Sequence, residues 1–436
     1  MNITNKIKTK SFDRLGFNRV GRVLNVLGTT IEAEGFEVPL NGRCILHTDG
    51  DPIYADVVGF NNNVTLLQPL GSVSGIKPNT KVTLFSDNPS LPFSDDFLGC
   101  VIDPLGEVLI GEPVKATMAM KTNNTPLNIN QRGSIDQRFN TGVCAIDSLF
   151  PIGFGQRIGL FAGTGVGKSM LLGMITRFSA ADVVVVGLIG ERGREVYEFV
   201  HHTLSEDARA KCVIVAAPAD YPPILRMQGA DVATAIAEHY RDKGLNVLLL
   251  VDSVTRYAQA QREVALASGE APATKGYPAS VFAKLPFLIE RAGKAKSGGS
   301  ITAIYTVLTE GDDMNDPVAD AARGVLDGHI ILSRKIASKG VYPAIDVPNS
   351  LSRLAQELSD DVTYSSILKV KELFSIIDEN EELYSLGLIE KGANPSVDKA
   401  MSMKKDLLNI VVQDFNKKSE STSSAKVLAN LTRKIN

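Results

Sequence analysis

The chain has 436 residues, of which 44% are hydrophobic and 22% charged, and its formal net charge is −3. This size suits two or three globular domains, and the charge gives no sign of bulk attraction to nucleic acid or to a membrane surface. The four cysteines lie far apart, which excludes a C-x-x-C motif and favours reduced thiols. No apolar run is long enough to span a bilayer, and no signal peptide is visible, so we expect a cytoplasmic protein.

The amino-terminal part predicts a short leading segment followed by a small β domain. Residues 1–16 carry several lysines and have no convincing amphipathic pattern. From 17 to 88, short apolar runs alternate with turn residues at regular spacing, which predicts a small β-barrel or sandwich. The apolar runs are 20–24, 53–58, 64–67 and 81–85, and the turns between them include 49–50, 61–63 and 77–79.

An α/β domain is predicted between residues 89 and 354. Its apolar runs are continuous, as strands buried on both faces of a parallel sheet require. Helical patterns such as 230–240 separate these runs, so we expect a parallel sheet covered by helices on both faces. The strand-like runs are 183–186, 247–251 and 301–307.

The part from 355 to 436 contains no predicted strand, and we expect a helical domain there. Residues 367–388 and 396–415 have the periodicity of amphipathic helices. The stretch 417–426 is rich in Ser, Thr and Lys, which predicts a polar and mobile tail.

The motif Ala-Gly-Thr-Gly-Val-Gly-Lys-Ser at residues 162–169 is the strongest functional signal. Its glycines let successive backbone N–H groups turn toward a phosphate, its lysine reaches the β and γ oxygens, and its serine hydroxyl suits Mg²⁺. A strand pattern at 156–161 precedes the motif and a helix pattern at 170–175 follows it, which argues against an incidental glycine-rich turn. We therefore predict ATP binding by Gly163, Thr164, Gly165, Val166, Gly167, Lys168, Ser169 and Met170.

Two carboxylates follow predicted strands and suit the same site. The run 247–251 ends in Asp252, which would hold Mg²⁺ through water. Alone, Asp252 would be an ordinary turn aspartate, but beside a phosphate loop the metal role is favoured. The run 183–189 is followed by Glu191, a carboxylate that can align and deprotonate an attacking water. Without the neighbouring motifs, the Glu/Arg-rich stretch 190–195 would favour a solvated surface loop.

Two further residues are ambiguous from their local sequence. Tyr342 precedes a proline and can either stack on adenine or pack its own loop. Arg353 is a single arginine of a kind that usually lies at the surface, and composition alone assigns it no catalytic role.

Taken together, these motifs resemble the catalytic subunits of hexameric rotary-type ATPases. Within that superfamily the chain is similar to the export ATPases of bacterial flagella and of type III secretion systems, over residues 20–400 or so, and the flagellar members are the more similar. The resemblance implies a RecA-like core after a β-barrel. It is carried by the segments 155–169, 188–196, 252–256, 274–278, 310–317 and 326–330.

The resemblance also implies a role for each matching residue. Glu191 falls on the catalytic glutamate, and Glu195 falls where a carboxylate helps to order metal-bound water. Tyr342 falls on the adenine-stacking position. Arg353 falls on the arginine finger, which enters the neighbouring subunit's site. The catalytic residues that the resemblance implies are therefore Lys168, Glu191 and Arg353.

A set of partners follows from the same resemblance. We expect a homo-hexamer whose barrels form a collar and whose loops 275–278 and 310–317 face a central stalk protein. Family members bind a regulatory stator-like dimer through their first residues. They work with chaperone–cargo complexes and a membrane export gate, at the cytoplasmic face of the inner membrane.

The chain departs from this family in two places. The leading segment is short, and the tail beyond Gln413 is polar where the family closes with an apolar helix. Regulator binding and cargo docking are therefore implied for two segments that depart from the family pattern.

The sequence also leaves rival functions to weigh. A catalytically silent ring subunit would lack Glu191. A ring-shaped RNA translocase would place basic and aromatic residues on the β domain, where few occur, so we expect no nucleic-acid partner. An injectisome ATPase remains open, and a rotary ATP synthase subunit is disfavoured by the short carboxy-terminal region.

Overall fold

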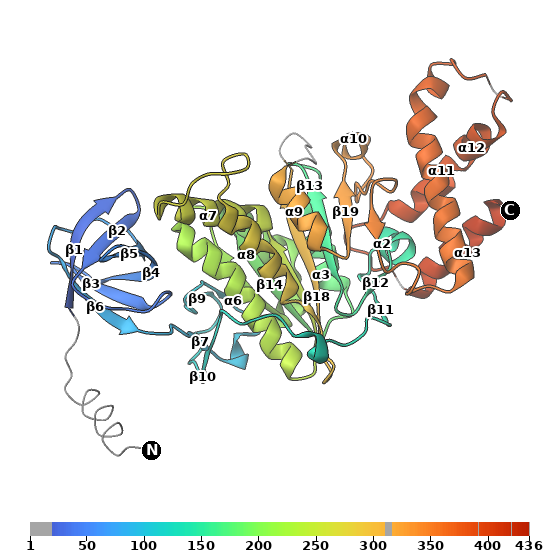
Figure 1. The fold of residues 1–436 in the computed structure, drawn as a ribbon. Helices are drawn as coiled ribbons and strands as arrows, with labels where there is room; N and C mark the ends of the chain where they lie inside the picture. Colours follow the sequence, from blue (N-terminus) through green and yellow to red (C-terminus); the bar gives the residue numbers. More distant parts are fainter. Residues whose placement is uncertain (1–19, 310–315, 391, 420, 436) are drawn as a thin grey trace.

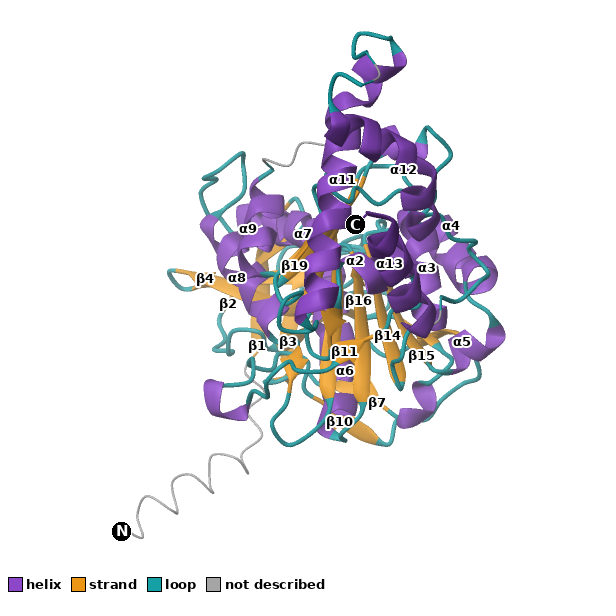
Figure 2. Ribbon diagram, turned by 90° about the vertical axis from the view of Figure 1, so that its right-hand side faces the viewer, coloured by secondary structure: helices purple, strands orange, loops and turns teal. Residues whose placement is uncertain are grey.

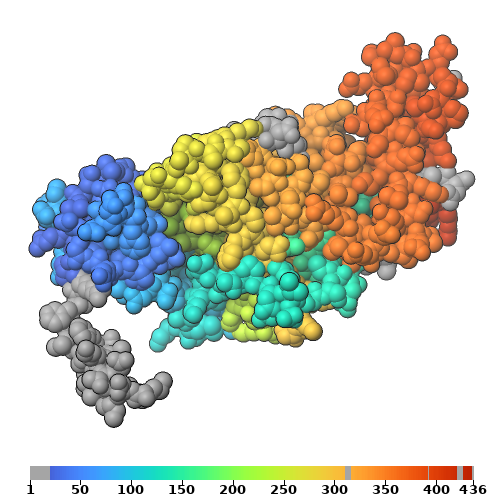
Figure 3. Space-filling view, viewed as in Figure 1, coloured from blue at the N-terminus to red at the C-terminus, as the bar shows by residue number. Residues whose placement is uncertain are grey.

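The computed structural model describes residues 20–309, 316–390, 392–419 and 421–435. A barrel, an α/β body and a group of helices follow one another along the molecule (Figures 1 and 3). The predicted leading segment 1–16 and residues 310–315 of the expected channel-facing loop lie outside the described residues. We retain 17–88, 89–354 and 355–436 as proposed domain limits.

The barrel confirms the all-β prediction for the amino-terminal part. Alternating residues of its strands point inward and bury a small core that includes Val23, Leu46 and Leu67. The strands close in the order β1-β2-β5-β4-β3-β6, so no edge remains open for pairing with another chain. They are β1 Val20–Leu27, β2 Thr30–Glu34, β3 Arg43–His47, β4 Ile53–Asn61, β5 Val64–Pro69 and β6 Lys81–Ser86.

Short elements connect the barrel to the central sheet. Two of their strands, β8 and β9, extend that sheet at one edge. These elements are β7 Leu91–Phe93, η1 Asp95–Phe97, β8 Val101–Ile102, β9 Val108–Ile110, β10 Met118–Met120, η2 Ile129–Gln131, β11 Arg138–Phe139, α2 Cys144–Leu149 and β12 Ile152–Gly153.

The central sheet runs β20-β19-β13-β18-β16-β14-β15-β8-β9, and all its neighbours from β19 to β8 pair in parallel. Antiparallel β17 pairs with β18, and antiparallel β20 and β9 close the two ends. The inner strands are largely apolar, as the continuous runs in the sequence predict. The strands are β13 Arg157–Ala162, β14 Val183–Ile189, β15 Cys212–Ala217, β16 Asn246–Asp252, β17 Gly293–Lys294, β18 Ser300–Leu308, β19 Gly328–Leu332 and β20 Leu351–Ser352.

Helices cover both faces of this sheet, which confirms the α/β class (Figure 2). Side chains of α2 and α3 share one apolar core with alternate strand residues, and those of α6 to α9 share the second core. None of the described helices has the length and apolar composition that a bilayer span requires. The helices are α3 Lys168–Phe178, α4 Gly193–Glu198, the π-helical turn η3 Phe199–Thr203, α5 Glu206–Ala210, α6 Pro223–Asp242, α7 Val254–Ala267, α8 Ala279–Glu290, α9 Pro317–Val325 and α10 Arg334–Ala337.

The carboxy-terminal part is helical, and it contains one helix that the sequence analysis does not predict. Helices α11 Asp361–Ser385 and α12 Pro395–Val411 match the two predicted amphipathic segments. A third helix, α13 Ser421–Ile435, follows and contacts α11, α12 and α2. Its Leu428 and Leu431 are 2% and 5% exposed and pack into the core, so a few apolar residues dock a segment rich in polar ones.

The docking of α13 can be tested by placing one charge on each of its faces. Leu431→Asp puts a carboxylate into the apolar contact and should lower stability by about 2 kcal/mol or more. Asn430→Asp adds the same charge at an exposed neighbour and should have little effect. Thermal unfolding and limited proteolysis of both variants measure the difference, and equal behaviour would contradict the docking of α13.

Candidate functional site

The phosphate loop lies where the sequence predicts it, between strand β13 and helix α3. Gly165 and Gly167 have φ values of 80° and 90°, a left-handed conformation that glycine adopts without strain. Gly167 caps the start of α3, which puts the positive end of the helix dipole at the loop. Ser169 and Met170, in the first turn, are exposed to solvent, as are Thr164 and Gly165 in the loop. The loop therefore offers backbone N–H groups and a hydroxyl to an anionic ligand.

Lys168 joins the loop to two strand ends. Its Nζ donates to Asp252 Oδ1 at 2.5 Å and to Glu191 Oε1 at 3.2 Å. Asp252 ends β16 and Glu191 follows β14, so two neighbouring parallel strands bring both carboxylates to one ammonium group. The structure thus brings together three residues that the sequence analysis selected from separate motifs.

Burial and charge act against each other in this cluster. Desolvation lowers the pKa of Lys168, but its attraction to Asp252 and Glu191 outweighs this and raises the pKa overall, which keeps the ammonium charged. Burial raises the pKa of Asp252, and Lys168 offsets this only in part. The pKa of Glu191 is also raised, mainly by burial and in addition by a hydrogen bond with Glu195. The charge of Lys168 opposes this rise but does not cancel it.

Glu195 lies on α4, the short helix that follows Glu191. Its side chain is partly exposed and is also 3.4 Å from Arg192. Gly190 makes this turn possible: its φ is 69°, and a Cβ there would lie 2.7 Å from Arg256. The turn after β14 therefore places the carboxylates of Glu191 and Glu195 next to each other at the site.

Tyr342 lies beside the phosphate loop, although it is far from it in sequence. Its side chain is 46% exposed, and a Cβ on Gly167 would lie 3.4 Å from two of its ring carbons. The ring thus has an open face next to the loop, where it is available to a ligand.

The sequence analysis missed a segment that supports both Tyr342 and α3, which we call the strap, residues 413–419. The backbone N–H of Gln413 donates to Tyr342 O at 3.1 Å. The Gln413 side chain accepts from Cys144 N at 2.7 Å and donates to Gly142 O at 2.9 Å. The predicted helix 396–415 includes the first residues of the strap, and no local pattern marks Gln413 as a bridge.

A second contact of the strap holds the far end of the phosphate-loop helix. The guanidinium of Arg177 stacks on the Phe415 ring at 3.8 Å from its centroid and donates to Phe415 O at 2.5 Å. Arg177 also reaches Asn416 Oδ1 at 3.2 Å. The helix that begins at Lys168 is therefore fixed at its far end to the carboxy-terminal part of the chain.

Arg353 does not lie in the same chain's Lys168 site. It is exposed, its Nη2 donates to Arg323 O at 3.2 Å, and its N–H donates to Asp327 O at 2.9 Å. Arg353 follows β20, and β20 pairs with the first residues of β19. The phosphate loop follows β13 and lies next to the last residues of β19. The length of that strand, on the order of 15 Å, separates Arg353 from the loop.

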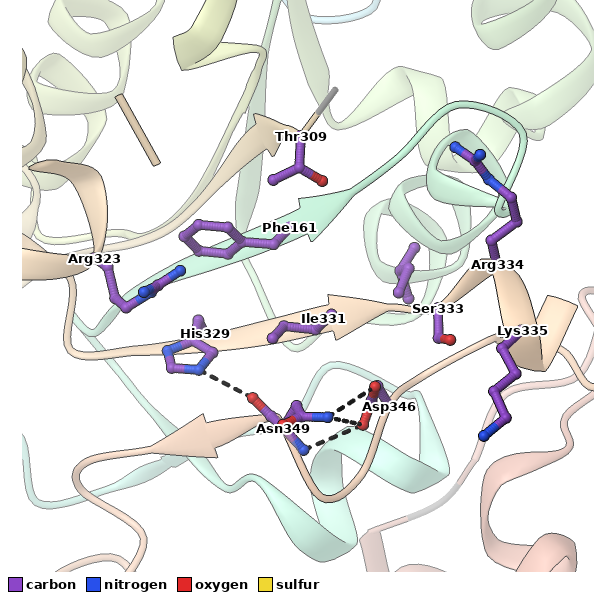
Figure 4. Close-up of a pocket in the computed structure, with 11 residues that line it drawn as sticks. Phe161, Thr309, Arg323, His329, Ile331, Ser333, Arg334, Lys335, Asp346 and Asn349 are labelled. Carbon is purple, nitrogen blue, oxygen red and sulfur yellow. Dashed lines mark hydrogen bonds between the residues drawn. The ribbon is translucent and has the colours of Figure 1, made fainter. Parts of the chain in front are cut away.

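A cavity of about 530 Å³ lies on the α9 side of β19. The His329 ring meets Phe161 edge-on at 5.8 Å and bonds to Asn349 O at 3.1 Å (Figure 4). Burial lowers the pKa of His329, which favours its neutral form. Neither Lys168, Glu191 nor Asp252 lines this cavity, so it is separate from the phosphate loop. Its lining residues are Phe161, Thr309, Arg323, His329, Ile331, Leu332, Ser333, Arg334, Lys335, Asp346 and Asn349.

In the described ranges, no group of three or more His, Cys, Asp or Glu side chains is arranged to hold a metal ion. The oxygen donors near the loop include the Ser169 hydroxyl and the carboxylates of Asp252 and Glu195. A cation held here would need further oxygen ligands from a bound phosphate or from water.

Comparison with known proteins places this arrangement in a family. Residues 142–352 match the nucleotide-binding domain of the ATP synthase alpha/beta family, residues 23–84 match its beta-barrel domain, and residues 360–430 match the T3SS EscN ATPase C-terminal domain. The chain is 48% identical to the flagellum-specific ATP synthase of Salmonella typhimurium, over 94% of this chain and 93% of that protein. The chain belongs to the flagellar and type III secretion ATPase family.

Further members support the same assignment. The flagellum-specific ATP synthases of Pseudomonas aeruginosa and Bacillus subtilis are 47% and 41% identical, over 94% and 95% of this chain and 92% and 96% of their own lengths. The assembled ATPase EscN of an enteropathogenic E. coli type III secretion system superposes with a TM-score of 0.89 at 39% identity, over 94% of this chain and 99% of that one. The same ATPase in complex with its central stalk EscO gives 0.86 at 38% identity, with the same coverage.

These comparisons confirm the resemblance drawn from the sequence, including its flagellar preference. The protein is an ATPase of flagellar type III export. They also make the RNA translocase and the silent ring subunit unnecessary as explanations of the chain.

The strap generates a prediction about this ATPase. Gln413→Ala removes the side-chain bonds to Cys144 and Gly142 and leaves a partly buried N–H and C=O without that partner. We expect a loss of stability of about 1–3 kcal/mol. We also expect weaker binding of an adenine nucleotide, because the Gln413 side chain anchors the strap whose backbone N–H supports Tyr342. Lys417→Ala, an exposed change in the same strap, is the control. Calorimetric binding of ADP that is equal in both variants would contradict the supporting role.

Proposed function

We propose that the chain hydrolyses ATP at the Lys168 cluster and thereby powers flagellar protein export as a ring. The observation that supports this most is the convergence of Lys168, Glu191 and Asp252 beside a glycine loop at the start of a helix. A lysine, a carboxylate for water and a carboxylate for a cation are the groups that phosphoryl transfer to water requires.

Binding would use the phosphate loop, the Lys168 ammonium and the Tyr342 ring. The N–H groups of residues 163–170 and the Lys168 ammonium would hold the β- and γ-phosphates. The open face of Tyr342 would stack on adenine. Lys168 would exchange its carboxylate partners for phosphate oxygens.

The oxygen donors suit Mg²⁺, which prefers hard oxygen ligands and keeps several waters. Ser169 would bind it directly, while Asp252 and Glu195 would hold its waters. The ion would supply positive charge to the phosphate oxygens.

Glu191 would act as the base toward water. The water oxygen forms a bond to the γ-phosphorus, the bond from that phosphorus to the bridging β–γ oxygen breaks, and a water proton passes to Glu191. In the structure, Lys168 donates to Glu191. When the phosphates attract Lys168, Glu191 loses a cation that lowered its pKa, so its basicity rises at the moment when the substrate is present.

Arg353 would complete the site of the neighbouring subunit. Its exposure and its distance from its own phosphate loop support a role across a subunit boundary. A guanidinium added there stabilises charge in the transition state only when the ring is assembled. The assembled EscN structure is a precedent for assembly in a similar protein.

The ring would work with the partners of an export apparatus. A similar protein, EscN, forms a complex with its central stalk EscO, which supports a stalk partner here. We propose that loops including 275–278 would contact it. A regulatory stator-like dimer, chaperone–cargo complexes and the membrane export gate would be further partners, at the cytoplasmic face of the inner membrane. No nucleic acid is part of this proposal.

The shared site is tested by ATP hydrolysis measured against protein concentration. Specific activity should rise steeply with concentration in the wild type, whereas Arg353→Ala should bind nucleotide and stay inactive. Arg433→Ala, an exposed change on α13, is the matched control and should behave as wild type. A fully active Arg353→Ala would place the whole site within one chain.

Mixing two inactive variants tests the same point more sharply. Lys168→Ala retains Arg353, and Arg353→Ala retains the phosphate loop. In randomly mixed rings about a quarter of the boundaries join two intact halves, so activity should return on mixing. No recovery, with mixed rings present, would count against catalysis between subunits.

The raised pKa of Glu191 generates a pH prediction. A carboxylate accepts a proton only when it is deprotonated, and a raised pKa leaves more of it protonated at a given acidic pH. The activity of the wild type should therefore fall on acidification at a higher pH than an unperturbed glutamate would cause. Glu191→Gln should bind ATP but lose at least about a hundredfold in turnover. A flat rate from neutral pH down to the range of ordinary glutamates would contradict the assignment.

A further inference from the structure

A buried hydroxyl, that of Thr306, lies next to Asp252 among strand residues that are mostly apolar. Thr306 is on β18 and is 0% exposed. In register it lies beside Leu160 of β13 and, continuing the β16 pairing, beside Asp252. The neighbouring strand residues that share its face toward α3, Leu160 and Leu188, belong to the apolar core. Valine has nearly the same shape as threonine and carries no polar group, so valine would be favoured at this position if packing alone determined the residue.

The hydroxyl of Thr306 is directed at the carboxylate of Asp252. Its Oγ1 lies 2.6 Å from Asp252 Oδ1 and 3.3 Å from Val251 O. A hydroxyl has one proton to donate, and the shorter contact to the charged acceptor is the stronger. A buried threonine that merely satisfies its own hydroxyl needs only a backbone carbonyl, as Thr176 and Thr234 show by bonding to residues four positions earlier.

Thr306 and Lys168 share the same acceptor atom. Lys168 Nζ reaches Asp252 Oδ1 at 2.5 Å, the oxygen that also accepts from Thr306. Both donors bond to the same oxygen of the Asp252 carboxylate, and together they fix the rotation of the carboxylate about its Cβ–Cγ bond. Neither of these two contacts uses the second oxygen, Oδ2.

We infer that Thr306 is a positioning residue that holds the Asp252 carboxylate in one rotation while Lys168 leaves it for the nucleotide. The inference rests on the proposed function. Lys168 cannot keep its bond to Asp252 and fully engage the phosphates, so the carboxylate would be free to rotate when it is needed. The Thr306 hydroxyl comes from a central strand and stays in place, so it would hold Oδ1 and leave Oδ2 available to the cation's waters.

The strand contains its own control. Thr302 is also on β18 and also 0% exposed, but its hydroxyl accepts from Gly155 N at 3.0 Å, near the opposite end of the sheet. Thr302→Val therefore removes a buried hydroxyl from the same strand without touching Asp252. Thr306→Ser retains the hydroxyl, and Thr306→Val removes it at nearly constant volume.

The test measures Mg²⁺ dependence, since a purely structural change would not alter it selectively. Binding of a fluorescent ATP analogue is titrated with Mg²⁺ and with EDTA for the wild type and the three variants, and ATP hydrolysis is measured against free Mg²⁺. Thr306→Val should reduce the Mg²⁺-dependent gain in affinity roughly tenfold and raise the Mg²⁺ requirement of turnover by a similar factor. Its affinity in EDTA should be unchanged. Thr306→Ser should restore most of both quantities, and Thr302→Val should match the wild type.

Three results would overturn the inference: a wild-type Mg²⁺ response in folded Thr306→Val, an equal loss in Thr302→Val, or no recovery in Thr306→Ser. Circular dichroism and thermal unfolding establish folding, and Thr306→Ala provides a smaller substitution if the valine variant does not fold. A wild type whose nucleotide affinity does not respond to Mg²⁺ would instead contradict the proposed function. The two failures are therefore distinguishable.

Discussion

One ammonium group, that of Lys168, ties together segments that lie far apart in the sequence. It reaches this position because the phosphate loop and two carboxylates all follow the carboxyl ends of parallel strands, which meet at one edge of the sheet. The cost of burying this charge is offset only because both carboxylates are present. The same constraint explains why the charges of this cluster satisfy one another, and why a bound phosphate would compete with the carboxylates for the lysine.

The strap connects this cluster to the helices at the end of the chain. Gln413 supports Tyr342 and the turn before α2, and Phe415 packs on Arg177 at the end of α3. The two ends of a bound nucleotide, adenine and phosphate, would thus lie on elements that share one carboxy-terminal segment. The same segment joins α12 to α13 in the chain.

Much of the fold and of the candidate site could be predicted because the signals are local. The glycine loop needs a fixed spacing within eight residues, and the strands that carry Asp252 and Glu191 are continuous apolar runs. Helix α13 was missed because two leucines, Leu428 and Leu431, dock it, and two residues make no visible periodicity among polar neighbours. The roles of Gln413 and Thr306 were missed because their partners lie far along the chain, and only folding brings them into contact.

The position of Arg353 has a consequence for counting. Each subunit carries a phosphate loop at one end of β19 and an arginine at the opposite end, so in the proposed arrangement it holds two halves that belong to different sites. An open string of subunits then has one complete site fewer than it has members, whatever its length. Closing the string into a ring adds the missing site without adding any protein. The catalytic unit is then the boundary between two subunits rather than a single subunit. The hydrolysis rate per subunit of such an enzyme depends on whether the ring is closed.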